Sequence, residues 1–115
     1  QTRDHSLTQV AVDTGDIKPS KMRFHKDRNK LTKALGIQSN LNVKERYDPI
    51  EMMPGDSILM CTDGFWEYID EKQMCKTLKK TDTAQEWMNT MLRVISKNIR
   101  KGNDNLTAIV AKIID

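Results

Sequence analysis

Two apolar runs, each bordered by an aspartate, constrain this chain of 115 residues more than any other feature. The first run, 57–62, ends in Asp63-Gly64, and the second, 106–114, starts directly after Asp104-Asn105. If the runs are neighbouring antiparallel strands, the end of one lies beside the start of the other. Asp63 and Asp104 would then meet at one edge of a sheet. Two carboxylates on strand ends favour a hard cation such as Mg²⁺ or Mn²⁺.

The length and composition indicate one small domain with a modest core. The chain is 37% hydrophobic and 30% charged, and its formal net charge of +3 is far below that of a nucleic-acid-binding tail. No stretch approaches the roughly 18 apolar residues of a membrane span, and the polar start does not resemble a signal peptide. Because the chain starts at Gln1, inside an apparent structural unit, we expect a fragment or a processed product.

Cys61 and Cys75 are the two cysteines of the chain. Their spacing is not C-x-x-C and no histidine lies nearby in sequence, which argues against a zinc site. Cys61 falls in an apolar run, where a thiol usually acts as a small core residue. We interpret both as reduced thiols of a cytoplasmic protein.

Capping residues predict two short helices in the first third of the chain. Asp4 or Ser6 can cap a helix that ends near Gly15. Pro19 suits the first turn of a second helix that runs to about His25.

A capping box formed by Asp70 and Gln73 predicts a third helix. We expect it to turn three residues inward: Met74, Cys75 and Leu78.

Thr83 and Glu86 form a second capping box, at the start of the most regular helix of the chain. Gly102 is expected to end this helix. Seven apolar residues recur at helical spacing and are expected to face the core: Ala84, Trp87, Met88, Met91, Leu92, Ile95 and Ile99.

The remaining segments predict strands and turns. Residues 41–47 alternate apolar and charged side chains, as in a half-exposed strand, and 53–56 form a turn. The run 57–62 is interpreted as a strand buried on both faces. One long helix can cover only one of those faces, so we expect the cover of the other face to come from outside this chain.

Three motifs resemble the metal-dependent serine/threonine protein phosphatases of the type 2C (PPM) class. They are MPGD (53–56), ILMCTDGFWE (58–67) and DNLTAIV (104–110), in matching order and spacing. TRDHSL (2–7) and 25–36 are similar to the bacterial branch. The resemblance covers nearly the whole chain and corresponds to the C-terminal half of that domain, with 1–36 as a helical, flap-like segment and 37–115 as sheet and helices.

The resemblance implies an α+β fold: an antiparallel sheet with flanking helices, forming half of a four-layer α-β-β-α sandwich. It further implies two or more Mn²⁺ or Mg²⁺ ions and hydrolysis of phosphoserine or phosphothreonine in proteins by a metal-activated water. Asp63 and Asp104 match two metal-ligand aspartates. Glu67 matches a position where many members have an aspartate that helps to hold a further metal.

Other segments that the family uses are absent from these residues: an acidic segment, a Gly-rich Asp-Gly turn, a phosphate-binding arginine and a Gly-Asp-Ser-Arg segment. We therefore expect this chain alone to be inactive, and no catalytic residue is assigned within it. We also expect an uncovered sheet face to be buried by another copy, through a homodimer or a swapped dimer.

Several other residues admit two interpretations. Trp66 is a core anchor or a substrate platform. His5 and His25 have local structural roles or act as general acids. The basic segment 18–33 is a solvated surface or steers acidic substrates.

Three functional classes follow from the sequence. The first is a cytoplasmic phosphoprotein phosphatase that opposes a Ser/Thr kinase, without nucleic-acid or membrane partners. The second is a non-catalytic, phosphatase-like binding or regulatory module. The third is a small basic RNA-binding domain, for which the segment 18–33 offers only one interleaved aromatic residue.

Overall fold

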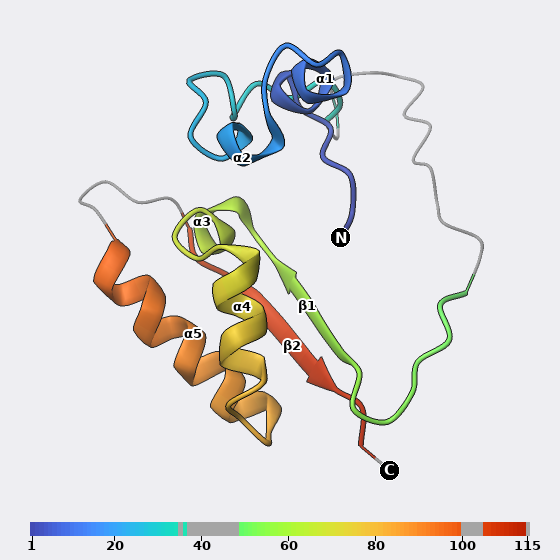
Figure 1. Ribbon diagram of the computed structural model, residues 1–115, viewed down its shortest axis with the longest axis vertical. Coiled ribbons are helices and arrows are strands. Elements are labelled where there is room, and N and C mark those ends of the chain that lie inside the picture. The colour runs from blue at the N-terminus through green and yellow to red at the C-terminus, as the bar shows by residue number, and fades with distance from the viewer. Residues whose placement is uncertain (35, 37–48, 100–104, 115) are drawn as a thin grey trace. The chain divides into compact units, whose positions relative to one another are not determined.

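The computed structural model describes residues 1–34, 36, 49–99 and 105–114. The chain divides into two compact units, 1–48 and 49–115. The predicted strand at 41–47 and the predicted helix stop at Gly102 lie outside the described residues. The unit 49–115 contains both strands and three helices in the order β1-α3-α4-α5-β2 (Figure 1). Helices against an antiparallel sheet agree with the predicted α+β fold class.

The two apolar runs pair as an antiparallel sheet. Strand β1 (Ser57–Cys61) lies beside β2 (Ala108–Lys112), in a register that runs from Ser57 opposite Lys112 to Cys61 opposite Ala108. The predicted turn precedes β1: the Asp56 amide donates to the Met53 carbonyl oxygen at 3.0 Å. The paired part of β2 is shorter than the expected run 106–114.

Among the described residues of the unit 49–115, helices cover one face of the sheet, as the sequence predicted for a single long helix. Burial of 57–62 on its other face depends on residues outside this chain and stays a prediction. Leu59 and Val110, which lie opposite one another, pack against the core. Ile58, Met60 and Ile109 are 40%, 60% and 61% exposed. Successive side chains of a strand point to opposite faces, and helices cover only the face that carries Leu59. Cys61 is also exposed, so it is not the core thiol that its apolar neighbours suggested.

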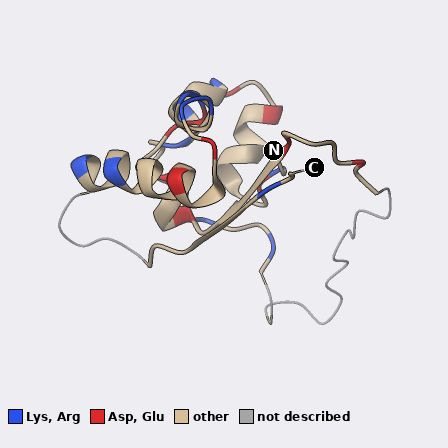
Figure 2. Ribbon diagram, turned by 90° about the horizontal axis from the view of Figure 1, so that it is seen from below, with Lys and Arg blue, Asp and Glu red and all other residues tan. Residues whose placement is uncertain are grey.

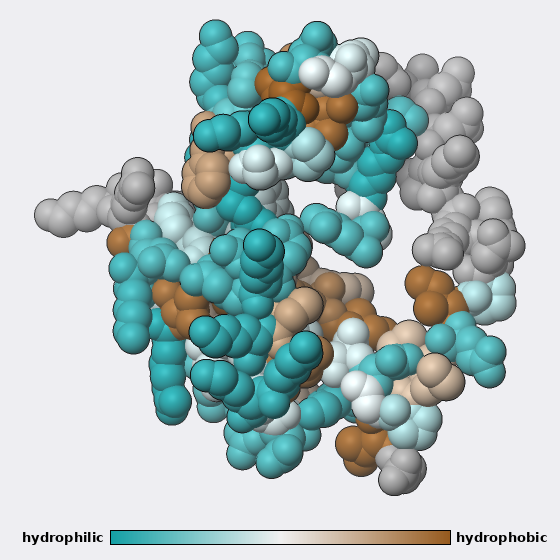
Figure 3. Space-filling view, in the orientation of Figure 1, coloured by the Kyte–Doolittle hydropathy of each residue, from teal (hydrophilic) through white to brown (hydrophobic). Residues whose placement is uncertain are grey.

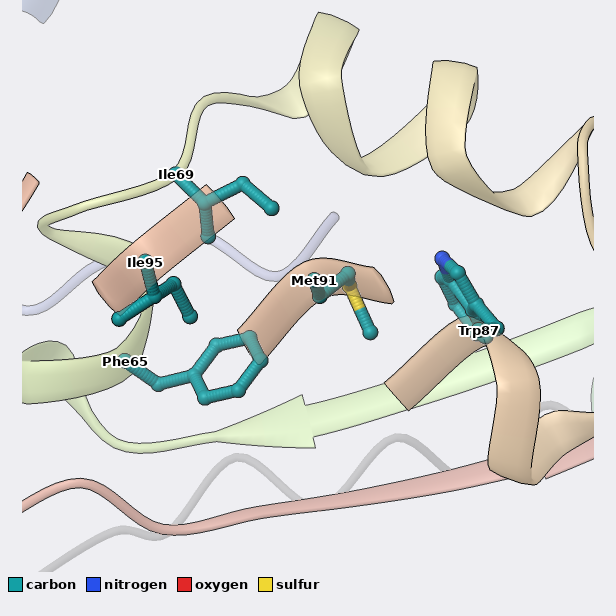
Figure 4. Packing of buried hydrophobic residues seen from close by; sticks show 5 residues of the cluster. All are labelled: Phe65, Ile69, Trp87, Met91 and Ile95. Carbon is teal, nitrogen blue, oxygen red and sulfur yellow. The ribbon is translucent and has the colours of Figure 1, made fainter. Parts of the chain in front are cut away.

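The core forms where two helices supply large side chains above the sheet. Phe65 comes from α3 (Asp63–Trp66), and Ile69 from the turn that follows α3. The long helix α5 (Ala84–Asn98) contributes the other three buried hydrophobic residues, Trp87, Met91 and Ile95 (Figure 4). Their spacing of four residues places them in one row, as the sequence predicted for these positions.

Helix α4 (Glu71–Leu78) begins at the predicted capping box of Asp70 and Gln73. Its inner face differs from the prediction at two positions, because Cys75 is exposed and Thr77 is buried. Thr77 provides a polar connection to α5: the Trp87 indole N–H lies 3.2 Å from the Thr77 hydroxyl oxygen and 3.2 Å from the Met74 carbonyl oxygen.

The N-terminus of α5 has the predicted capping box of Thr83 and Glu86. The Glu86 carboxylate accepts from the Asp82 and Thr83 amides, and these bonds hold the pKa of Glu86 below its ordinary value. Leu92 and Ile99 are 37% and 44% exposed, so they lie at the edge of the apolar face and not in the core. Within the described ranges, no helix is both long and apolar enough to cross a membrane.

The unit 1–48 contains the two short predicted helices, α1 (Leu7–Asp13) and α2 (Pro19–Met22). Ser6 caps α1, because its hydroxyl oxygen accepts from the Gln9 amide at 3.2 Å. The segment before α1 is tied to 30–32: the Leu7 amide donates to the Lys30 carbonyl oxygen, and the Thr32 amide to the His5 carbonyl oxygen, both at 2.8 Å. Helix α2 ends at Met22, earlier than the predicted end near His25.

The inner face of α5 can be tested with a matched pair of substitutions. Ile95 is 1% exposed and Leu92 is 37% exposed. Ile95→Ala should lower the free energy of unfolding by about 2–5 kcal/mol, because it leaves a cavity. Leu92→Ala should cost about 1 kcal/mol or less, because that side chain stays partly in water. Urea denaturation monitored by circular dichroism measures both, and equal losses would contradict this assignment of the inner face.

Candidate metal centre

The register of the sheet brings the residues before Asp63 next to the residues after Asp104. Cys61 pairs with Ala108, and one step further the Thr62 amide donates to the Thr107 carbonyl oxygen at 3.0 Å. The end of β1 therefore lies beside the start of β2, as the sequence predicted. Asp104 itself lies outside the described residues, so its distance from Asp63 stays a prediction.

Thr62 joins the two strand ends through its side chain. Its hydroxyl group donates to the Asn105 carbonyl oxygen at 3.0 Å and accepts from the Thr107 amide at 3.1 Å. Asn105 directly follows Asp104, and Thr62 directly precedes Asp63. The hydroxyl thus fixes the backbone next to both predicted ligands. Sequence reasoning missed this role, although the position of the threonine, at the end of one apolar run and next to the aspartate, was a usable signal.

Asp63 is the first residue of α3, and its side chain is exposed. One carboxylate oxygen, Oδ1, accepts from the Gly64 amide at 2.8 Å. That bond fixes the orientation of the carboxylate, because both groups belong to the same tight turn. Among the described residues, no ion pair neutralises the carboxylate. Asp63 therefore presents a negatively charged oxygen donor at the edge of the sheet.

Glu67 lies one helical turn after Asp63. The Glu67 amide donates to the Asp63 carbonyl oxygen at 2.9 Å, and the Glu67 side chain is half-buried. Residues four apart lie on the same side of a helical turn, so the predicted pair of acids shares one side of α3. Sequence reasoning left the role of Trp66 open. The core anchor of this segment is the neighbouring Phe65, which is 0% exposed, while Trp66 is half-buried.

The donor chemistry of these residues fits a hard divalent cation. Carboxylate and carbonyl oxygens are the ligands that Mg²⁺ and Mn²⁺ prefer. The described residues do not complete such a site, since they hold no group of three or more His, Cys, Asp or Glu side chains that could bind a metal. A metal at this edge therefore requires Asp104 and oxygen donors beyond those described.

The histidines have local contacts in the unit 1–48. His25 Nδ1 accepts from the Asp27 amide at 3.2 Å, which is ordinary turn chemistry. The His5 backbone carbonyl accepts from Thr32 at 2.8 Å, and its side chain is exposed. Of the basic residues in 18–33, Lys30 lies 2.7 Å from the Asp27 carboxylate and lowers the pKa of Asp27.

Comparison with known proteins finds relatives and solved structures of one class. No protein-family model matches the chain. The serine/threonine phosphatase stp of Listeria monocytogenes is 29% identical over 111 residues, which cover 96% of this chain and 42% of that protein. The serine/threonine protein phosphatase PstP of Mycobacterium tuberculosis is 28% identical over 115 residues, which cover 99% of this chain and 21% of that protein.

The solved structures that match this chain are also serine/threonine phosphatases. The serine/threonine phosphatase Stp1 of Staphylococcus aureus matches with a TM-score of 0.77 at 26% identity, over 99% of this chain and 43% of that one. The PPM Ser-Thr phosphatase MsPP of Mycobacterium smegmatis, solved with cacodylate, matches with a TM-score of 0.70 at 26% identity, over 100% of this chain and 47% of that one.

The chain is therefore homologous to bacterial serine/threonine phosphatases of the PPM class, and its α+β fold is consistent with half of their α-β-β-α sandwich. It spans less than half of the length of the relatives and structures described above.

The role of Thr62 can be tested by substitution. Thr62→Val keeps the shape of the side chain but removes the hydroxyl, and should lower the free energy of unfolding by about 1 kcal/mol. The Thr107 amide should also exchange its hydrogen faster, because it loses its acceptor. Thr62→Ser retains the hydroxyl and should keep most of the protection. Hydrogen exchange followed by NMR measures this amide, and unchanged protection in Thr62→Val would show that the side chain does not join the strand ends.

Proposed function

We propose that this chain is the C-terminal part of a metal-dependent protein serine/threonine phosphatase that removes phosphate from phosphoserine and phosphothreonine. In this proposal Asp63 and Asp104 are metal ligands, and Glu67 helps to hold a further ion. The observation that carries the proposal is the pairing of β1 with β2, closed by the Thr62 hydroxyl, which brings the neighbours of both aspartates together. The bacterial phosphatase relatives support it independently.

Asp63 and Asp104 would hold Mn²⁺ or Mg²⁺ at such a site, and the ion would supply an acidified water and charge to offset that of phosphate. The contribution of this chain is to hold carboxylate oxygens in place on strand ends. Because the Asp63 carboxylate is already oriented by the Gly64 amide, little conformational freedom is lost when it binds a cation. A substrate phosphate would need positive charge that these motifs do not supply, so the 115 residues alone are proposed to be inactive.

The proposal also includes the cellular setting. A protein phosphatase of this kind acts on phosphorylated proteins in the cytoplasm and opposes a Ser/Thr kinase, and it needs no nucleic acid or membrane. The alternative is a non-catalytic, phosphatase-like binding or regulatory module, in which the aspartates serve only the turn structure.

The metal ligands are tested by neutral substitutions that keep side-chain size. Asp63→Asn and Asp104→Asn should each weaken Mn²⁺ binding at least tenfold, because each removes a charged oxygen donor. Glu67→Gln should have a smaller effect. Asp82→Asn, an exposed aspartate before α5, is the matched control and should change nothing. Titration of Mn²⁺ followed by electron paramagnetic resonance measures free metal directly.

Activity separates the enzyme from the non-catalytic module. The coding region around these residues should be sequenced and its complete product assayed for Mn²⁺-dependent release of phosphate from a phosphothreonine peptide. If the protein is a phosphatase, phosphate is released and Asp63→Asn abolishes the release. If it is a non-catalytic module, no phosphate is released. Release of phosphate by the pure 115-residue chain would overturn the proposal that it is inactive alone.

We also propose that the isolated chain self-associates through the uncovered sheet face. Met60 and Ile109 lie directly opposite one another there and are 60% and 61% exposed. Replacing both with lysine should convert dimers to monomers in analytical ultracentrifugation, because charges on the face resist burial. Leu92→Lys, on the exposed edge of α5, is the control and should leave the dimer intact. A wild-type chain that stays monomeric and unfolds cooperatively would contradict this proposal.

A further inference from the structure

Helix α4 carries an unbroken basic surface on the side that faces away from the core. Residues 72–80 contain four lysines and no aspartate or glutamate. Lys72, Lys76 and the C-cap residue Lys79 recur at intervals of four and three residues, so they lie along one side of the helix. Lys80 directly follows Lys79 in the turn after the helix. Figure 2 marks the basic and acidic positions along the ribbon, and in Figure 3 the surface over α4 is hydrophilic.

The lysines surround a shallow hollow of about 450 Å³, lined by these four residues and Cys75. Most of the lining is apolar, as expected where the methylene stems of lysines form the walls. The methylene stems of these lysines offer a ligand contact area, and their ammonium groups offer it positive charge. We call this hollow with its four lysines the α4 basic surface.

The charges of the α4 basic surface have no acidic partner in the part of the chain that the structure describes. None of these ammonium groups lies within 4.0 Å of a described carboxylate. Two lysines elsewhere do have partners: Lys30 pairs with Asp27, and Lys112 donates to the Thr81 carbonyl oxygen at 3.0 Å. Like charges three and four residues apart repel one another on a helix. An anionic partner would relieve this repulsion.

We propose that the α4 basic surface binds an acidic segment of a partner protein, in extended conformation with carboxylates at alternate positions. The rise of a helix places Lys72 and Lys76 about 6 Å apart along its axis. Alternate side chains of an extended peptide point to the same side and are about 6.8 Å apart. A Glu-x-Glu segment laid along α4 can therefore pair its two carboxylates with Lys72 and Lys76.

A nucleic acid fits the same surface less well. Single strands are held by aromatic side chains on which the bases stack, together with a long basic groove. The lining of the hollow includes no aromatic residue, and it covers only two helical turns. Binding at α4 involves neither Asp63 nor Asp104, so it does not depend on phosphatase activity.

Peptide binding to the full 115-residue chain tests the inference. The probe is a fluorescent seven-residue peptide with glutamate at alternate positions, and its glutamine version is the control ligand. Fluorescence anisotropy should detect binding of the glutamate peptide only, and the affinity should fall as salt is raised. The double reversal K72E/K76E should weaken binding at least tenfold.

The matched control is R93E/K97E, which reverses the same number of charges at exposed positions of α5. It should change the affinity less than twofold. If K72E/K76E fails to fold by circular dichroism, K72Q/K76Q replaces it and should still weaken binding at least threefold. Equal losses in the α4 and α5 variants would overturn the inference, since the effect would then follow total charge.

Cysteine labelling locates the peptide without any substitution. Cys75 lines the hollow, and Cys61, which is also exposed and not in a disulfide, lies at the end of β1. Bound peptide should slow alkylation of Cys75 and leave Cys61 unaffected, as read by mass spectrometry. No binding of the glutamate peptide, or no protection of Cys75, would overturn the inference. So would tighter binding of an oligonucleotide with the same lysine dependence, which would assign the surface to nucleic acid.

Discussion

The antiparallel pairing of β1 with β2 is the constraint on which the rest of the unit 49–115 depends. It aligns Leu59 with Val110 on one face, and there α5 can place Trp87, Met91 and Ile95 against them. The same register sets the Thr62 hydroxyl between the strand ends. A slip of β2 by one residue against β1 would turn Val110 away from the helices, and it would separate Thr62 from Asn105 at the candidate site.

Local signals in the sequence were sufficient for most elements. Both capping boxes begin helices as predicted, because each satisfies backbone amides within four residues and needs no distant partner. The pairing of the two strands also followed from the sequence, since Asp63-Gly64 marks the end of the first strand and Asp104-Asn105 marks the start of the second. Errors arose where burial depends on packing between distant segments: Cys61 and Cys75 were expected among the buried residues, but both are exposed.

The candidate site also contains residues that the sequence predicted and residues that it did not. Sequence could name Asp63, Glu67 and Asp104, because acids beside strand ends form a readable pattern. Sequence reasoning missed Thr62, although its place between an apolar run and Asp63 was a signal, because its bonding partner lies 43 residues away. Nor could it choose Phe65 over Trp66 as the buried aromatic residue, because that choice depends on the direction in which α3 leaves the sheet. The order and spacing of the motifs still identified the phosphatase class that the relatives share.

The contact between Thr62 and Asn105 also has a consequence for how the chain folds. It closes a loop of 43 residues, whereas α3, α4 and α5 inside that loop need only local bonds. Closing a long loop costs chain entropy before its contacts form, so we expect strand pairing to be slower than helix formation and to follow it. During synthesis on a ribosome, the core residues of α5 must wait for β2 before they have a sheet to pack against. Until then the apolar row of α5 remains accessible to chaperones.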